Sequence, residues 1–386
     1  MPSALNSLDS LDSTAAQTAG SATRLQDYLA ACAARIDAEI ALVLEAEVED
    51  PWLRGAISYH FGWAGTDFVP VPAAQRASGG KRLRPALSLL CYQGARLRQG
   101  WAADESDDAI PFATALELVH NYSLIHDDIM DRDLLRRGRP TVWSICGKAQ
   151  AINVGNCLHG AAFAACLGRQ RTPGNGVGVG DVITALATAS LRMTSGQRQD
   201  LMFETLDDVT VDMYVQMIAG KTAALITCAT YGGALLGYSG ARAHPALPAY
   251  ADFGREFGMG FQIRDDILGI WGLESQTGKP SGGDIRRRKR SLPVLLALQE
   301  ASPGARAYLS ALYAMTTDLT NEQEGDVRTI LEECQAQALA QRHADLHGQR
   351  ALSALTNAAG GPEALRDNPF LTALEQLTGF ATTRMG

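Results

Sequence analysis

Apolar residues recur at three- and four-residue steps through most of the chain, which is the period of helices that bury one face. Runs with this pattern cover 24–48, 83–98, 109–131, 149–168, 181–201, 209–237, 247–271, 291–299, 306–315, 324–346 and 363–379. Alternating β-branched runs of strand length are nearly absent, and the Val-Pro-Val-Pro run at 69–72 is broken by proline. The pattern predicts an all-α protein.

The polar segments between these runs are short, and none has the length or polarity of an interdomain linker. We expect a disordered lead-in over residues 1–23, which are rich in Ser, Ala, Thr and Asp, and one all-α domain over 24–386. The lead-in lacks the basic start and apolar core of a signal peptide. The uncharged run Thr222–Ala241 contains Thr, Tyr and Gly residues, which favours a helix inside a bundle, so we expect no stable membrane span.

Composition excludes several classes of protein. The 386 residues include 34 Lys and Arg against 42 Asp and Glu, a net charge of −8 that argues against nucleic-acid binding. The seven cysteines are odd in number and contain no CxxC pair, which supports neither a disulfide framework nor a zinc site. We expect reduced thiols and a cytoplasmic protein.

Two acidic motifs each close an apolar helical run. In the first, Asp127-Asp128-Ile129-Met130-Asp131, the outer aspartates share one helix face because four residues turn the helix by about 40° beyond a full turn. Such carboxylates repel each other unless a hard cation lies between them, and Mg²⁺ takes oxygen ligands completed by water and phosphate. Asp265 and Asp266 form the second motif. Together the motifs indicate one apolar cavity with carboxylates on opposing walls, whereas either alone could be a solvated helix end.

Basic residues flank both motifs. The clusters are Gly79–Pro85 (GGKRLRP), Arg136–Pro140 (RRGRP), Lys221, Lys279 and Arg286–Arg290 (RRRKR). Arginine binds phosphate through two parallel hydrogen bonds, and lysine binds it as a point charge. The arrangement predicts a pocket for a polyphosphate small molecule, although the last run could instead be a solvated basic surface.

These residues resemble a known family, the trans-isoprenyl diphosphate synthases, also called the polyprenyl synthetases. The motifs GGKRLRP, HDDIMDRDLLRRGRPTVW, GQRQDLMFE, GKTAAL and GFQIRDDILGIWG…TGKPSGGDI…KRSLP stand in the family's order between Gly79 and Leu295. The resemblance implies a single large helical bundle, a homodimer, and the head-to-tail joining of an allylic diphosphate (C5 to C15) to isopentenyl diphosphate. It implies Mg²⁺, with Mn²⁺ able to substitute, to assist ionisation of the allylic substrate.

The resemblance also implies roles for individual residues. For the metal, the matching positions are Asp127, Asp128, Asp131, Asp265 and Asp266. For isopentenyl diphosphate, they are Lys81, Arg84, His120 and Arg137. For the allylic diphosphate, they are Arg136, Lys221, Lys279 and Lys289. Beside the reacting carbons, they are Thr222 and Gln262, whose dipoles could steer a carbocation. One position departs from the family, because Gly269 stands where the second motif usually has a third aspartate.

Product length follows from the residues upstream of the first motif. Tyr122 and Ser123 precede Asp127 by five and four positions, about one turn at ~1.5 Å per residue, where a growing chain would pass. A large ring beside a small residue leaves part of the cavity floor open, and the motif carries no two-residue insertion. This pattern resembles producers of geranylgeranyl diphosphate (C20), with C15 or C25 products as alternatives.

Two other functions share the predicted fold. A class I terpene cyclase would ionise a diphosphate but would need no isopentenyl diphosphate site, which this sequence carries. A non-catalytic partner subunit would have damaged acidic motifs, whereas here only Gly269 departs. We therefore expect a chain-elongating prenyltransferase.

Overall fold

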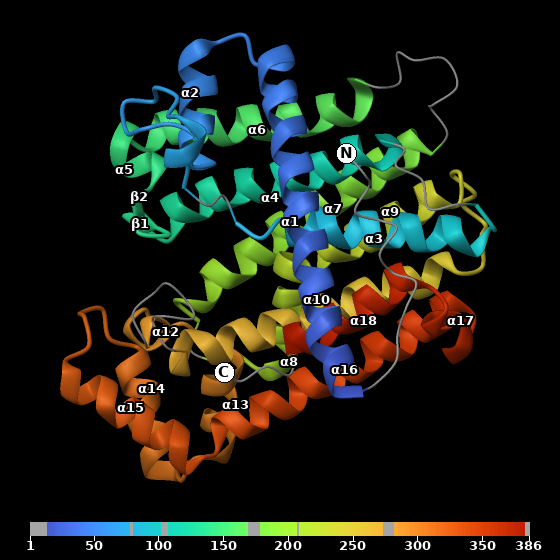
Figure 1. The fold of residues 1–386 in the computed structure, drawn as a ribbon. Helices are drawn as coiled ribbons and strands as arrows, with labels where there is room; N and C mark the ends of the chain where they lie inside the picture. The colour runs from blue at the N-terminus through green and yellow to red at the C-terminus, as the bar shows by residue number, and fades with distance from the viewer. Residues whose placement is uncertain are drawn as a thin grey trace. The chain divides into compact units, whose positions relative to one another are not determined.

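The computed structural model describes residues 14–77, 80–101, 107–168, 178–206, 208–272 and 282–382, with side chains from residue 25 onward. These residues confirm the all-α prediction (Figure 1). The first elements are α1 (Thr14–Glu47), α2 (Pro51–His60), η1 (Ala73–Gln75), α3 (Leu83–Arg98), η2 (Asp107–Ala109), α4 (Ile110–Met130), β1 (Leu135–Arg136), β2 (Arg139–Pro140), α5 (Val142–Cys146) and α6 (Lys148–Gly168). Strands β1 and β2 form a two-residue antiparallel hairpin.

Helices also make up the later part of the described chain. They are α7 (Val179–Phe203), α8 (Val211–Ile218), the π-helical turn η4 (Ala219–Ala223), α9 (Ala224–Gly237), α10 (Leu247–Trp271), α12 (Gly283–Arg286), α13 (Leu292–Glu300), α14 (Pro303–Tyr313), α15 (Asn321–Glu333), α16 (Ala336–Ala359), α17 (Pro362–Arg366) and α18 (Pro369–Thr382).

Helix boundaries differ from the expected runs at several places, and the run 363–379 divides into α17 and α18. Helix α1 already begins at Thr14 through Ala-rich text, before the expected start at residue 24, while residues 1–13 of the lead-in lie outside the described residues. Helix α2 was not predicted. Its N-terminus is capped by Asp50, whose carboxylate accepts from the N–H groups of Trp52 and Leu53 at 2.8 and 3.2 Å. The run 324–346 is interrupted at Gln335, which has a φ of 51°.

The chain divides into two compact units, each described here by itself. Unit 1 takes its residues from 1–184, 229–248 and 356–376, and unit 2 from 185–228, 249–355 and 377–386. The expected single domain over 24–386 stays a prediction.

Helix α4 forms the centre of unit 1. It packs against α6, α3 and α1, and most of its residues from Ile110 to Val119 are buried. This explains why its sequence is apolar on all faces rather than along one stripe. The burial of its body fixes the direction in which its last turn, with the first acidic motif, leaves the core.

Unit 2 has a core built by α8, α10, α13 and α16. Its buried side chains include Tyr214 and Met217 of α8, Met259 and Ile263 of α10, and Leu292 at the start of α13. Helix α10 carries the second acidic motif, so this core fixes that motif as α4 fixes the first.

Among the described residues, one helix is long and apolar enough to cross a bilayer by length and composition. It is α6, and 44% of its most apolar window is buried inside the protein. A buried core helix gives the same signal, so this helix does not indicate a stable span. The uncharged run Thr222–Ala241, considered from the sequence, forms much of α9 and is largely buried.

Candidate active site

The first acidic motif lies at the C-terminal end of α4 in unit 1. Asp131 is the C-cap residue, and its N–H donates to the carbonyl of Asp127 at 2.7 Å. Asp131 is exposed and Asp127 is half-buried, whereas Asp128 is 2% exposed. The motif therefore presents two carboxylates outward and turns one into the protein.

The buried Asp128 is paired with Arg136 of β1. Nε of Arg136 donates to both carboxylate oxygens at 2.8 and 3.0 Å, and Nη2 lies 2.7 Å from Oδ1. Burial raises the pKa of Asp128, and the bidentate arginine opposes that shift. The structure thus pairs Asp128, which was expected at the metal, with Arg136, which was expected at the allylic diphosphate.

The hairpin that carries Arg136 and Arg137 is fastened to α2. Arg139 donates from Nη1 to the carbonyl of Tyr59 and from Nη2 to that of Ala64, both at 3.0 Å. The hydroxyl of Tyr59 in turn donates to the carbonyl of Pro140 at 2.7 Å. Residues of α2 and of the segment after it therefore set the position of the two arginines.

Three of the four residues expected at isopentenyl diphosphate come together in unit 1. Burial and the charges of Arg84, Arg136 and Arg137 hold the pKa of His120 well below its usual value, so this ring is neutral. Arg137 reaches the GGKRLRP segment, since a Cβ added at Gly80 would lie 2.6 Å from its Nη2.

The fourth expected residue, Lys81, is exposed. Arg84 differs from it, because its Nε is buried and has no hydrogen-bond partner among the described residues. Burial lowers the pKa of Arg84, and the nearby carboxylate of Glu117 counteracts this. An unpartnered buried donor on a cation is costly unless an anion completes it, which fits a diphosphate site.

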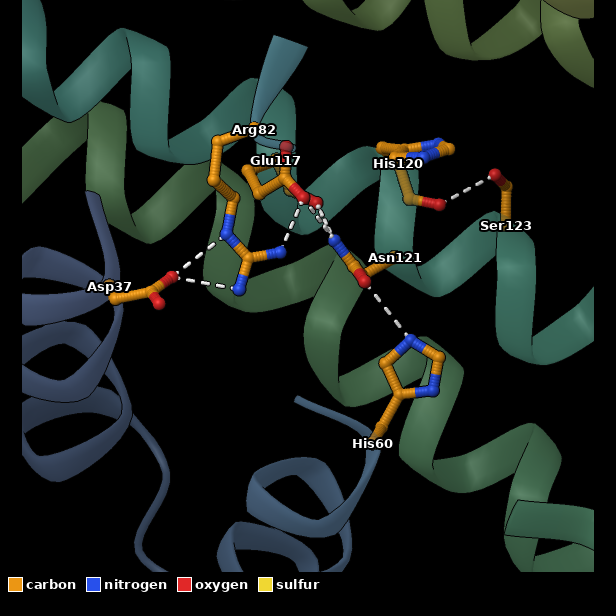
Figure 2. A network of polar contacts seen from close by, with 7 residues as sticks. All are labelled: Asp37, His60, Arg82, Glu117, His120, Asn121 and Ser123. Carbon is orange, nitrogen blue, oxygen red and sulfur yellow. Dashed lines mark hydrogen bonds and ion pairs between the residues drawn. The ribbon is translucent and has the colours of Figure 1, made fainter. Parts of the chain in front are cut away.

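A pocket of about 180 Å³ opens in unit 1 between the end of α2, the end of α4 and the hairpin. Its walls include Tyr59, His60, Asp128, Arg136 and Arg137. His60 was not identified from the sequence. Figure 2 shows it joined through Asn121 and Glu117 to a buried arginine, Arg82.

In the second acidic motif, on α10 in unit 2, one aspartate is again buried and the other lies at the surface. Asp265 is exposed, whereas Asp266 is buried and accepts hydrogen bonds on both oxygens. Its donors are Tyr214 Oη at 2.7 Å, Gln262 Nε2 at 2.9 Å, the N–H of Leu292 at 3.3 Å and Lys289 Nζ at 3.4 Å. Asp266 is therefore anchored by the protein, and Lys289 lies beside the motif as expected.

Lys221 and Thr222 stand in the π-helical turn η4. Lys221 forms an ion pair with Asp200 of α7, a residue that the sequence analysis did not select. Burial raises the pKa of Asp200, but Lys221 and Lys289 outweigh burial and the net shift is downward. Gly196 permits this arrangement, because a Cβ there would collide with the backbone N of Lys221. Single π turns in helices are frequent at functional sites.

The two polar residues expected beside the reacting carbons contact each other. Thr222 Oγ1 donates to Gln262 Oε1 at 2.6 Å, and Gln262 holds Asp266 through its amide nitrogen. The orientation of the Gln262 amide is therefore fixed from both ends. Lys279, expected at the allylic diphosphate, lies outside the described residues.

The space beside Gly269, where the family usually has a third aspartate, is occupied by another carboxylate. A Cβ added at Gly269 would lie 2.6 Å from Cγ of Asp284 and closer still to one of its oxygens. The carboxylate of Asp284, in α12, therefore fills the space beside Gly269 that a third aspartate of this motif would need.

Tyr122 and Ser123 differ in their surroundings. The Tyr122 ring lies against His159 of α6, with centroids 4.4 Å apart, and against His126 at 5.7 Å. His159 continues the stack to Phe163 at 5.2 Å. Ser123 instead donates to the carbonyl of His120 within the same helix at 2.8 Å (Figure 2).

No group of three or more His, Cys, Asp or Glu side chains converges as a metal centre within the described ranges. The outward carboxylates Asp127, Asp131 and Asp265 nevertheless suit a hard cation in their chemistry. Mg²⁺ commonly takes one or two protein carboxylates and completes its shell with water and substrate phosphate. The donor set fits such an ion, with phosphate needed as a ligand.

Comparisons with known proteins agree on the family. Residues 71–334 match the model described as polyprenyl synthetase. The geranylgeranyl diphosphate synthase of Mycobacterium tuberculosis is 40% identical over 320 residues, 83% of this chain and 84% of that protein. The (2E,6E)-farnesyl diphosphate synthase of the same organism is 36% identical over 301 residues, 76% of this chain and 78% of that protein. A polyprenyl synthetase structure from Streptomyces coelicolor A3(2) has a TM-score of 0.79 and 32% identity, covering 92% of this chain and 99% of that one.

The all-α fold and the paired acidic motifs with their flanking cations define an isoprenoid prenyltransferase. The chain belongs to the polyprenyl synthetase family, which confirms the resemblance identified from its motifs. The two Mycobacterium relatives are named for products of different length.

The sequence analysis missed His60, Asn121 and Asp200. A signal existed for two of them. Asp200 stands in the GQRQDLMFE motif, and Asn121 follows His120 directly. His60 had no such signal, because it lies in the helix α2 that was not predicted.

We predict that Gly269→Asp, which restores the usual acidic residue, lowers the free energy of unfolding by about 1–3 kcal/mol and does not raise turnover, because it overpacks the Asp284 carboxylate and sets like charges together. Chemical denaturation of the purified variants measures this. Gly325→Asp, at a helical position with open space, is the matched control and should change stability little. The loss in free energy of unfolding caused by Gly269→Asp should be smaller when Asp284 is replaced by alanine. An equal loss with and without Asp284→Ala would contradict the account.

Proposed function

We propose that the protein condenses isopentenyl diphosphate with allylic diphosphates of C5 to C15, head to tail, and ends at geranylgeranyl diphosphate (C20). The observation that carries this proposal is the cationic site of Arg84, His120 and Arg137, in which Arg84 keeps a buried donor without a partner among the described residues. A cyclase ionises one diphosphate and has no use for this second anion site. An elongating enzyme needs it for isopentenyl diphosphate.

In this reaction Arg84 and Arg137 bind the diphosphate of isopentenyl diphosphate. His120 stays neutral among them and can donate one ring N–H without adding a positive charge. The substrate is then held with its double bond oriented for attack, so that positioning lowers the barrier.

The allylic diphosphate is the leaving group, and we assign its binding to Lys221 and Lys289 of unit 2. Both lysines are held by carboxylates, Lys221 by Asp200 and Lys289 by Asp266, so their charge is fixed in place before substrate arrives. Asp127, Asp131 and Asp265 are the residues that would hold Mg²⁺, with Mn²⁺ as a substitute. When bound, the metal supplies Lewis-acid neutralisation of the leaving diphosphate.

Thr222 and Gln262 are assigned to the carbocation. The Gln262 amide accepts from Thr222 and donates to Asp266, so its dipole cannot rotate freely. A fixed dipole stabilises developing positive charge without reorganising during the reaction. The final proton leaves with the departing diphosphate, and no side-chain base is required.

Two further parts of the proposal concern the protein as a whole. Its seven cysteines all lie in the described ranges and form no disulfide, which supports a reducing, cytoplasmic location. A homodimer is proposed from family membership.

Chain length is proposed to be limited where Tyr122 packs against His159. The ring contact at 4.4 Å joins α4 to α6 and continues to Phe163, so a growing chain that passes along α4 would meet a wall of rings. Such a wall stops elongation when the chain reaches it, and we propose that it does so at C20.

We expect purified protein with Mg²⁺ and isopentenyl diphosphate to convert C5, C10 and C15 allylic diphosphates to a common C20 product. Mass spectrometry of the dephosphorylated alcohols measures this. A series that ends at C15 or C25 would support the condensation reaction but contradict the proposed product length. Cyclic hydrocarbon formed without isopentenyl diphosphate would contradict elongation, and absence of turnover with every starter would contradict an active enzyme.

The ring wall predicts that Tyr122→Ala and His159→Ala both shift the product distribution towards C25 and longer chains, because each substitution removes a ring that blocks the path. Product analysis by mass spectrometry measures the shift. Tyr308→Ala serves as the control, since Tyr308 lies exposed on α14 and contacts Asp326 instead. An unchanged C20 product in both wall variants would show that other residues limit the chain.

A further inference from the structure

Arg82 stands in the GGKRLRP segment between two cations that were expected at isopentenyl diphosphate, Lys81 and Arg84, and has no assigned role of its own. Lys81 is exposed, and Arg84 lies in the first turn of α3. Arg82 differs from both, because it is only 2% exposed and is not among the residues that line the pocket of unit 1. Its guanidinium therefore serves something other than direct contact with a ligand.

The backbone of Arg82 has an unusual conformation. Arg82 is the N-cap residue of α3 and is left-handed, with φ 46° and ψ 40°, which is unfavourable for a residue that carries a Cβ. Its carbonyl accepts from the N–H of Ala86 at 3.1 Å, so this turn directs the chain into α3. Such residues persist where the surrounding contacts hold them, and they are frequent at functional sites. The direction in which Arg84 leaves the helix thus depends on what holds Arg82.

The side chain of Arg82 is held from three directions within unit 1. Nη1 donates to Oε1 of Glu117, on α4, at 2.9 Å, and Nε donates to Oδ1 of Asp37, on α1, at 2.8 Å (Figure 2). Nη2 lies 2.7 Å from the same oxygen of Asp37. The guanidinium also lies over the buried ring of Phe61, 5.1 Å from its centroid. A planar group with several donors can make all these contacts at once.

Glu117 connects Arg82 to the cations of the proposed ligand site. Burial lowers the pKa of both Arg84 and Arg137, and the charge of Glu117 counteracts this in each case, so the carboxylate lies close to both. Its Oε1 already accepts from Arg82 at 2.9 Å and from Nδ2 of Asn121 at 2.8 Å. Glu117 is therefore satisfied without Arg84, whose Nε has no partner in the described part of the chain.

We propose that Arg82 is a positioning residue for isopentenyl diphosphate, which holds Arg84 in place through the turn at the start of α3. The inference rests on the proposed function for the identity of the ligand. Asp37 and Glu117 fix the guanidinium of Arg82, the guanidinium fixes the left-handed turn, and the turn sets the direction of Arg84. Arg82 acts through Arg84 and does not contact the ligand.

A cation at position 82 would also attract a diphosphate through its charge alone, and two substitutions separate the two effects. Arg82→Lys keeps the charge, but a single ammonium lacks the planar fork that contacts two carboxylates at once. Asp37→Ala removes a negative charge, so it should tighten the binding of an anion if only charge matters. If position matters, Asp37→Ala loosens Arg82 and weakens binding.

Calorimetric titration of the full-length protein with isopentenyl diphosphate, without allylic substrate, tests the proposal. We expect binding to weaken about tenfold or more in Arg82→Lys and about threefold or more in Asp37→Ala, because a misplaced Arg84 no longer meets the diphosphate in the right geometry. Arg255→Lys is the matched control and should bind within about twofold of the wild type, since Arg255 also contacts two carboxylates, Asp252 and Glu256, but lies on α10 in unit 2. Thermal unfolding of each variant verifies that it is folded.

Binding by Arg82→Lys within about twofold of the wild type overturns the proposal, even where thermal unfolding shows a loss of stability. Binding by Asp37→Ala that equals or exceeds that of the wild type overturns it too, and so does wild-type protein that fails to bind isopentenyl diphosphate. If Arg82→Lys does not fold, Asp37→Ala decides alone, because the Asp37 side chain is 36% exposed and its loss disturbs the core less.

The proposed function is tested separately by product formation. A wild type that binds isopentenyl diphosphate but makes no product would contradict the proposed reaction, while the affinities of the two variants still decide the role of Arg82.

Discussion

A carboxylate can be buried only when cations or hydrogen-bond donors replace the water it loses, and this constraint organises both acidic motifs. Asp128 is buried against the guanidinium of Arg136, and Asp266 is buried among Tyr214, Gln262 and Lys289. In each pair the preceding aspartate lies nearer the surface. The pairing of aspartates thus serves two purposes: one residue ties the motif to its surroundings, and the other is left for the proposed metal.

The same constraint acts on the cations. Lys221 and Lys289 are held by Asp200 and Asp266, and their positions in the π-helical turn and before α13 would carry uncompensated charge without these partners. Arg84 is treated differently, because its buried Nε is left without a partner in the described chain. Pairing fixes the cations proposed for the allylic diphosphate, while the site proposed for isopentenyl diphosphate keeps donor capacity for its ligand.

Much of the fold could be predicted because the helical period is long and its ends carry clear signals. The runs 83–98 and 247–271 coincide with α3 and α10 at both ends. Helix α2 could not be found in this way, since it has only ten residues and its start depends on the side chain of Asp50. The break at Gln335 has a left-handed backbone at a residue other than glycine, which the sequence does not signal.

The sequence predicted those site residues that lie in or beside contiguous motifs. Arg84 and Arg137 each stand in a recognisable motif, His120 lies shortly before one of these motifs, and the structure brings the three together. Contacts between distant segments could not be predicted: His60 and Asn121 are 61 residues apart, and Asp200 and Lys221 are 21 apart. The pairing of Asp128 with Arg136 also escaped, because each residue was assigned to a ligand rather than to the other.

The central claim is that the cations of α3, α4 and the hairpin form a site for isopentenyl diphosphate, distinct in role from the allylic site. Steady-state kinetics of Arg84→Gln, with each substrate varied in turn, tests it most directly. The account predicts that KM for isopentenyl diphosphate rises about tenfold or more while KM for the allylic diphosphate stays within about twofold, because one charge-assisted interaction is lost at one substrate only. A rise confined to the allylic substrate, or no change for either substrate, would contradict it.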